Sequence, residues 1–160
     1  MKKLIVLYLV IFLFSCNGIA QKSTEKESET YKISKTEAEW KAELTEMQFY
    51  VLRQAGTERP FSSSLNKNYN AGIYVCAACN TPLFKSEHKF DSGTGWPSFD
   101  REIDDNVSYS PGGNGYYGIE EHCGTCGGHL GHIFNDGPKE TTGKRHCING
   151  VSLKFIPKDN

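Results

Sequence analysis

Four of the six cysteines stand in two pairs, and the two members of each pair are separated by two residues. Cys76 and Cys79 form the first pair, and Cys123 and Cys126 form the second, after the 43 residues 80–122. A two-residue gap lets both thiolates of a pair face one point, and two such pairs complete a tetrahedron around Zn²⁺. Because four sulfurs fill every coordination position, such an ion is structural. The sequence therefore predicts one structural zinc ion per chain, acting as a clamp across the domain.

Two other interpretations of the paired cysteines stay open: two redox-active pairs, or two disulfide bonds. Neither pair stands in a visible strand-to-helix unit of the thioredoxin kind. A disulfide that closes a two-residue loop is tight and usually reducible, although an oxidising compartment would suit one. Zinc remains the favoured prediction.

Cys147 is the thiol that these assignments leave over. Its neighbours Lys144, Arg145 and His146 are cationic or ionisable, and a nearby Arg favours the thiolate, which is the nucleophilic form. The alternative is a small buried side chain, a common role of free cysteine. The residue is thus a candidate nucleophile.

Two histidines strengthen that interpretation. His129 and His132 are three apart, so they would face opposite sides of a regular strand, but Gly131 permits a bulge that would bring both rings to one pocket. The alternative for each is a histidine satisfied by ordinary hydrogen bonds. Asp136 follows at a turn, where its carboxylate could orient an imidazole or cap the turn.

Capping signals place two helices ahead of these residues. Residues 34–37 and 45–48 have the S-x-x-E and T-x-x-Q forms of a capping box. They predict helices at about 35–43 and 46–55, with Gly56 ending the second. Short segments typical of strands follow at 72–75, 82–84, 107–110, 129–134, 147–149 and 151–155, with a turn at 112–115. We predict a mainly β fold, an antiparallel sandwich or barrel-like domain with two short N-terminal helices.

The first sixteen residues are predicted to be an export signal. Lys2 and Lys3 precede an apolar run over 4–14, which is short for a membrane span. The run leads to Cys16 in a sequence that resembles the lipobox of bacterial lipoproteins, whose cysteine is acylated; cleavage after Ala20 is the alternative. The polar residues 17–33 are predicted to form a flexible tether, and 34–160 the folded domain. We expect an exported, cell-envelope protein, either lipid-anchored or secreted.

Composition excludes other classes of partner. The chain has 18 Lys and Arg against 19 Asp and Glu, a net charge of −1, so nothing indicates binding to nucleic acid or a cationic membrane patch. Any contact with a membrane would be made through the lipid anchor alone. The length of 160 residues favours one domain, and a monomer is expected.

Five motifs in order along residues 36–156 resemble the B-type methionine sulfoxide reductases. They are G-T-E and P-F-S at 56–62, G-I-Y-V-C at 72–76, K-F-D-S-G-T-G-W-P-S-F at 89–99, G-H-L-G-H-I-F-N-D-G-P at 128–138, and R-H-C-I-N with S-L-K-F at 145–155. The resemblance implies reduction of the R epimer of methionine sulfoxide in proteins, in a β fold with zinc on the paired cysteines.

The resemblance also implies roles for single residues. Cys147 would attack the sulfoxide sulfur and become a sulfenic acid. Trp96 would form the aromatic wall for the substrate methyl group; a core tryptophan is the alternative. The other implied residues surround the sulfoxide oxygen or support that group: Asn149, His129, His132, Arg145 and Asp136.

Three positions depart from the family pattern. Thr94 stands where many members carry a resolving cysteine, so we expect an external thioredoxin-like dithiol to reduce Cys147 directly. His146 replaces an aromatic residue and could shift the Cys147 pKa in either direction. His122 stands where Arg is common.

Two other functions are kept as alternatives. A non-catalytic, zinc-stapled β binding module would use the aromatic pocket without needing Cys147. A disulfide oxidoreductase would instead use the paired cysteines themselves.

Overall fold

Two capped helices open the part of the chain that the structure, a computed structural model, describes: residues 31–111 and 118–159. Helix α1 spans Glu37–Glu43 and α2 spans Glu46–Gln54. The capping box of α2 is the predicted one, on Thr45, but that of α1 pairs Thr36 with Glu39 and not Ser34 with Glu37. Residues 36–39 match the same capping-box pattern as residues 34–37. The structure uses the later match, so α1 starts two residues later than predicted.

The end of α2 also differs from the prediction. The left-handed residue is Ala55, with φ of 53°, and not Gly56. Gly56 instead lies under the exposed Tyr50 ring, which a Cβ at this position, 2.3 Å away, would push aside. The glycine therefore allows the Tyr50 ring to pack closely against it, whereas the left-handed turn is made by Ala55.

Three strands form the smaller sheet, in the order β2-β1-β9: β1 is Gly72–Cys76, β2 is Pro82–Lys85 and β9 is Leu153–Pro157. Both pairings are antiparallel. Short 3₁₀ turns at Ser64–Lys67 (η1), Ser86–His88 (η2) and Gly150–Ser152 (η3) connect the elements. The predicted strand at 151–155 thus begins only at residue 153, because η3 takes its first two residues.

Six strands form the larger sheet, in the order β3-β4-β8-β7-β6-β5 and antiparallel throughout. They are β3 (Lys89–Phe90), β4 (Ser98–Phe99), β5 (Val107–Pro111), β6 (Ile119–Cys123), β7 (His129–Phe134) and β8 (Arg145–Ile148). The mainly β, antiparallel fold with two N-terminal helices is confirmed. The predicted turn at 112–115 lies outside the described residues.

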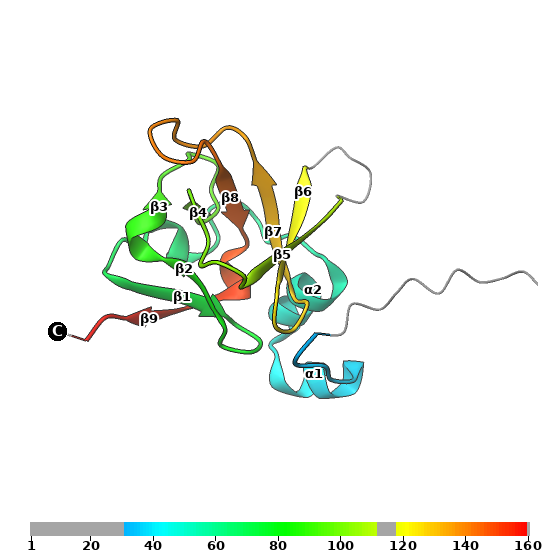
Figure 1. Cartoon of the computed structure of the whole chain (residues 1–160). Helices are drawn as coiled ribbons and strands as arrows, with labels where there is room; N and C mark the ends of the chain where they lie inside the picture. Colours follow the sequence, from blue (N-terminus) through cyan, green and yellow to red (C-terminus); the bar gives the residue numbers. More distant parts are fainter. Residues whose placement is uncertain (1–30, 112–117, 160) are drawn as a thin grey trace, which may run out of the picture.

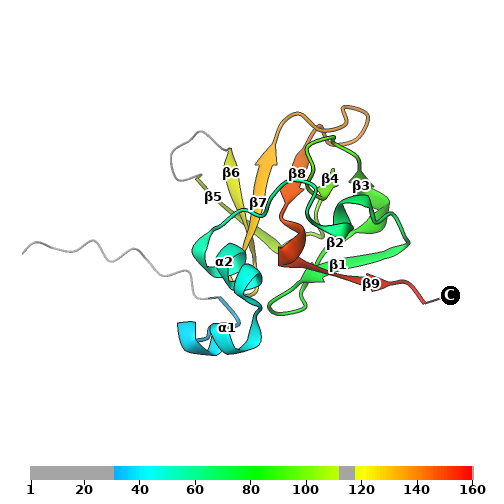
Figure 2. The same ribbon diagram turned by 180° about the vertical axis from the view of Figure 1, so that it is seen from behind.

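Helix α2 packs against β7 and η3, whereas the C-terminal end of β9 lies on the other side of the domain (Figures 1 and 2). The core between helices and sheets is aromatic: Phe84 stacks on Phe99 with ring centroids 4.4 Å apart, and Tyr74 meets Phe99 edge-on at 5.0 Å. Trp40 and Leu52 bring the helices into the same core. This packing fixes the end of α2 beside β7.

The predicted export signal, Cys16 and residues 17–30 lie outside the described residues. The last part of the predicted tether is in contact with the domain: the Ile33 N–H donates to the Thr125 carbonyl at 3.0 Å, and Ile33 packs on the core. Within residues 31–111 and 118–159, no helix has the length and apolarity needed to cross a membrane.

Candidate functional site

The two cysteine pairs meet where the two sheets approach each other. Cys76 ends β1 and Cys123 ends β6, and each begins a turn of the same form. In both turns the fourth residue after the first cysteine, Asn80 or Gly127, has a positive φ and donates its N–H to that cysteine's carbonyl, at 2.9 and 2.8 Å. The repeated turn aims each pair of thiols inward.

The four sulfurs form a ligand set for one metal ion. All lie within 4.8 Å of one another, and two contacts cross between the pairs: Cys76 to Cys126 at 3.8 Å and Cys79 to Cys123 at 3.5 Å. A tetrahedral zinc site with Zn–S bonds of about 2.3 Å places its sulfurs about 3.8 Å apart. The predicted cluster therefore fits a tetrahedral ion that would join β1 of one sheet to β6 of the other.

A separate cavity of about 810 Å³ contains most of the predicted catalytic residues. It lies over β7 and β8, where the end of α2 approaches them, and its lining residues are Ala55, Thr57, Trp96, Glu120, His129, Gly131, His132, Phe134, Cys147 and Asn149. The structure thus brings together Cys147, both histidines, Asn149 and Trp96. It places Arg145 and Asp136 outside the lining.

Cys147 is a half-buried free thiol on β8, opposite His132 of β7. Burial raises the pKa of Cys147, and the nearby Arg145 charge offsets this only in part. The sequence-based argument that Arg145 favours the thiolate was right in direction, but the effect of burial is larger. Cys147 therefore rests as a thiol, and it would need a base to act as a nucleophile.

His129 is held by a carboxylate that the sequence analysis did not identify. The His129 Nδ1 lies 2.6 Å from the Glu120 Oε1, whereas its Nε2 is buried without a hydrogen-bond partner among the described residues. Burial lowers the pKa of His129 and of His132, and Glu120 opposes that shift for both. Glu120 therefore takes the imidazole-orienting role that was considered for Asp136.

The predicted bulge brings the two histidines together. His122 of β6 pairs with His129, and Glu121 pairs with Gly131, so β7 has one extra residue, Leu130, between the two pairs. The His129 and His132 rings consequently lie 5.5 Å apart, centroid to centroid. Gly131 allows close approach of β8, because a Cβ there would lie 2.0 Å from the Cys147 carbonyl oxygen.

Glu58 is a second organising residue that sequence reasoning missed. Its buried carboxylate accepts the N–H groups of Gly150 and Val151 at 2.5 and 3.0 Å, and its own N–H donates to the Asn149 Oδ1 at 3.0 Å. The Trp96 Nε1 donates to the Glu58 carbonyl at 3.2 Å. One loop residue therefore fixes both the amide and the indole at the cavity.

Arg145 and Asp136 support the cavity wall from outside. The guanidinium donates twice to the Asp136 carboxylate, at 2.8 and 2.9 Å, and stacks 4.3 Å from the Phe134 ring centre. Since Phe134 lines the cavity, this pair fixes the β7–β8 hairpin beside Cys147. The supporting role predicted for both residues fits this geometry.

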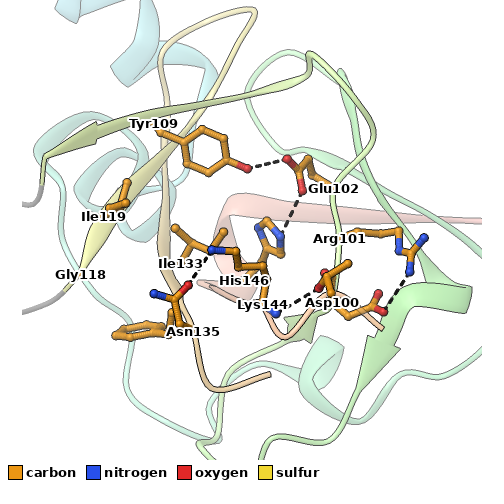
Figure 3. A pocket seen from close by; sticks show the side chains of 12 residues that line it. Asp100, Arg101, Glu102, Tyr109, Gly118, Ile119, Ile133, Asn135, Lys144 and His146 are labelled. Atoms are coloured by element: carbon orange, nitrogen blue, oxygen red, sulfur yellow. Dashed lines mark hydrogen bonds and ion pairs between the residues drawn. The ribbon is translucent and has the colours of Figure 1, made fainter. Parts of the chain in front are cut away.

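His146, adjacent to Cys147 on β8, faces the other side of the sheet, as strand alternation requires. There it borders a second cavity of about 540 Å³ (Figure 3). It lies 2.6 Å from the Glu121 carboxylate and 3.1 Å from that of Glu102, which also accepts from the Tyr109 hydroxyl. Burial lowers the His146 pKa, but the two carboxylates raise it to about 9. The histidine is therefore a buried cation and not part of the Cys147 cavity.

We expect His146→Phe to destabilise the domain by about 3–5 kcal/mol, because it leaves the fully buried Glu121 carboxylate unpaired. The double variant Glu121→Leu/His146→Phe should recover most of this loss, since an apolar pair of similar volume replaces a buried ion pair at little cost. Urea unfolding of the wild type, of His146→Phe, of Glu121→Leu and of the double variant measures both effects. Additive losses in the double variant would show that the two side chains do not interact.

Comparison with known proteins agrees with this geometry. The SelR domain matches residues 44–157. The peptide methionine sulfoxide reductase MsrB of Methanosarcina mazei is 53% identical over 131 residues, which cover 81% of this chain and 93% of that protein. The MsrB of Chromohalobacter salexigens is 49% identical, covering 79% and 96%.

A plant relative is also similar. The chloroplastic peptide methionine sulfoxide reductase B2 of Arabidopsis thaliana is 46% identical, with coverage of 88% of this chain and 68% of that protein. Among solved structures, the Mis18 'Yippee-like' domain covers 57% of this chain and all of that domain, with a TM-score of 0.43 and 13% identity.

Proposed function

The chain belongs to the SelR-domain family of peptide-methionine (R)-sulfoxide reductases, and from that premise we propose that Cys147 reduces methionine sulfoxide in proteins by attacking its sulfur. The observation that carries the proposal is the shared cavity of Cys147, two histidines and Trp96. A thiol, acid-capable imidazoles and an aromatic wall are the groups that this reaction needs.

The proton balance of the reaction requires only the groups in this cavity. The half-buried thiol of Cys147 gives its proton to an imidazole, for which the His129 Nε2 is free among the described residues. The imidazolium, held by Glu120, returns that proton to the sulfoxide oxygen as the thiolate attacks. The S–O bond of the sulfoxide breaks, and the oxygen with its proton ends on the Cys147 sulfur. The substrate sulfur thereby gains two electrons and becomes methionine, and Cys147 loses two and becomes a sulfenic acid.

Trp96 and Asn149, which Glu58 positions, would bind the substrate. The Trp96 ring offers the methyl group an apolar wall. The Asn149 Nδ2 donates to the Leu130 carbonyl at 3.0 Å, which leaves its second N–H for the sulfoxide oxygen. The proton from the imidazolium and the hydrogen bond from Asn149 neutralise the negative charge on that oxygen. This favours breakage of its bond to sulfur.

An external dithiol would complete the cycle. Thr94 lies beside the nucleophile, with its Oγ1 3.9 Å from the Cys147 sulfur, and a hydroxyl cannot form a disulfide. A thioredoxin-like partner would reduce the sulfenic acid, releasing water and becoming a disulfide itself. The four paired cysteines would hold structural zinc and take no part in turnover.

The proposed site of action is the cell envelope. Lys2, Lys3 and the apolar run over 4–14 support an export signal, and Cys16 supports a lipid anchor. Mass analysis of the mature N-terminus separates acylation at Cys16 from cleavage after Ala20, and an intact Met1 in exported protein would contradict both.

The activity is tested with the two epimers of methionine sulfoxide in a short peptide. With dithiothreitol as reductant, the purified chain is expected to convert the R epimer to methionine and to leave the S epimer, as resolved by chiral chromatography. Equal conversion of both epimers, or of neither, would count against the proposal.

The proposed reduction by an external dithiol predicts the oxidised state of the protein. After one turnover without reductant, Cys147 is expected to carry a sulfenic acid that dimedone traps, with no internal disulfide in the peptide map. Thr94→Cys serves as the matched comparison, because it places a thiol beside the nucleophile and should form that disulfide. A Cys147 disulfide in the wild type would contradict direct reduction.

A further inference from the structure

Four side chains form a compact array on the cavity face of β6 and β7. Glu120 and His122 are two apart on β6 and so share a face. Across the ladder, His122 pairs with His129 and Glu120 pairs with His132, because the bulge at Leu130 corrects the three-residue spacing of the β7 histidines. The array therefore offers three imidazoles and one carboxylate on one surface.

Three of these groups converge on one point. The Glu120 Oε1 lies 2.6 Å from the His129 Nδ1 and 3.5 Å from the His122 Nε2, and one donor atom from each residue lies within 4.8 Å of the other two. The His122 and His129 rings are 6.0 Å apart and nearly perpendicular. Two imidazole nitrogens and a carboxylate oxygen at such separations can share one metal ion.

From these contacts we propose a second metal site, separate from the four cysteines, in which Glu120, His122 and His129 bind a divalent transition-metal ion such as Zn²⁺. One carboxylate and two imidazoles are a common ligand set for these ions, and imidazole favours them over Mg²⁺ and Ca²⁺. His129 is buried and the other two are half-buried beside the cavity, which leaves the ion a route of entry. The Ser110 hydroxyl, 2.9 Å from the His122 Nε2, would give up that contact.

The site has a consequence for catalysis, and this consequence rests on the proposed function. A metal ion on the His129 Nδ1 replaces the proton that this nitrogen shares with Glu120. The ring can then no longer accept the Cys147 proton and return it, because both of its nitrogens would be occupied throughout. Metal binding is therefore expected to inhibit the enzyme reversibly.

Binding is tested on protein that already has one zinc ion per chain and has been freed of excess metal. Calorimetric titration with Zn²⁺ should show one further equivalent in the wild type. His122→Gln keeps a hydrogen-bonding group beside Ser110 but removes a ligand, so it should weaken this second binding at least about tenfold. His88→Gln is the matched control. His88 also contacts carboxylates, those of Glu87 and Asp100, but within the described part of the chain it belongs to no such cluster, so its change should leave binding intact.

Two results would overturn the site: no second equivalent in the wild type, or equal binding by wild type and His122→Gln. Glu120→Gln gives an independent variant, should His122→Gln fail to fold, and it too should weaken the second binding. Its thermal unfolding and its content of the first zinc show whether it is intact.

The inhibition is measured in a single turnover, because dithiols in a steady-state assay would bind the metal. Reduced enzyme is mixed with methionine sulfoxide, with and without Zn²⁺, and the methionine formed is counted per chain. The wild type should lose at least about tenfold in rate, and His122→Gln should keep its metal-free rate. An enzyme inactive without metal would refute the proposed function and leave the binding result standing.

Discussion

Cys147→Ser is expected to lower the reduction of methionine sulfoxide by at least a factor of about 10³, because a serine hydroxyl is a far weaker nucleophile at neutral pH and cannot form a sulfenic acid. The residue is half-buried, and Ser is nearly isosteric, so the cavity should persist. Methionine formation from the R epimer, with dithiothreitol in excess, gives the measurement.

The same variant separates the three functions considered from sequence. It should keep its metal and its thermal unfolding midpoint, because Cys147 lies outside the four-sulfur cluster. A binding module would show no activity to lose. A disulfide oxidoreductase acting through the paired cysteines would keep its full activity in Cys147→Ser, and that result would exclude Cys147 as the nucleophile.

The groups that sequence predicted correctly are those whose chemistry is local. A two-residue gap between cysteines determines how a pair can turn, so the four-sulfur cluster could be predicted without knowing the sheet. The bulge beside Gly131 was also predictable, because the two flanking histidines needed it to face one cavity. In each case the spacing along the chain carried the geometry.

The residues that were missed act through long-range pairing. Glu120 reaches His129 only through the register of β6 and β7, and Glu58 organises residues more than 90 positions later. Strand β6 itself was missed because Glu121, where alternation predicts an apolar side chain, is buried as the partner of His146. No spacing rule indicates such a pair.

Asp136 was considered as an orienting residue for an imidazole because it follows the histidines closely in sequence. The hairpin instead pairs Phe134 with Arg145, and this register sets Asp136 against the guanidinium. Neighbours in sequence are separated by strand alternation, as Cys147 and His146 also show. The register of the strands therefore determines which carboxylate contacts which basic side chain.

Loss of the zinc ion that we propose on the four cysteines is expected to have the largest effect on stability. A structural zinc site contributes about 10–16 kcal/mol of binding free energy at neutral pH, whereas a domain is stable by about 5–15 kcal/mol. Cys123→Ser removes a fully buried ligand at the end of β6, and it should leave the chain largely unfolded at room temperature. Circular dichroism and the zinc content of the purified protein measure the outcome.

Cys147→Ser is the matched control, since it changes the same atom outside the cluster and should keep one zinc ion per chain. Cys76 ends β1 of the smaller sheet and Cys79 lies in the turn after it, whereas Cys123 ends β6 of the larger sheet and Cys126 lies in the turn after that. Sulfur contacts of 3.5 and 3.8 Å join the two pairs. A metal-free Cys123→Ser protein that unfolded at the same temperature as the wild type would show that core packing alone joins the sheets. The Cys147 cavity is built partly on β7, which follows the second cysteine pair. Its structure would then not depend on the metal.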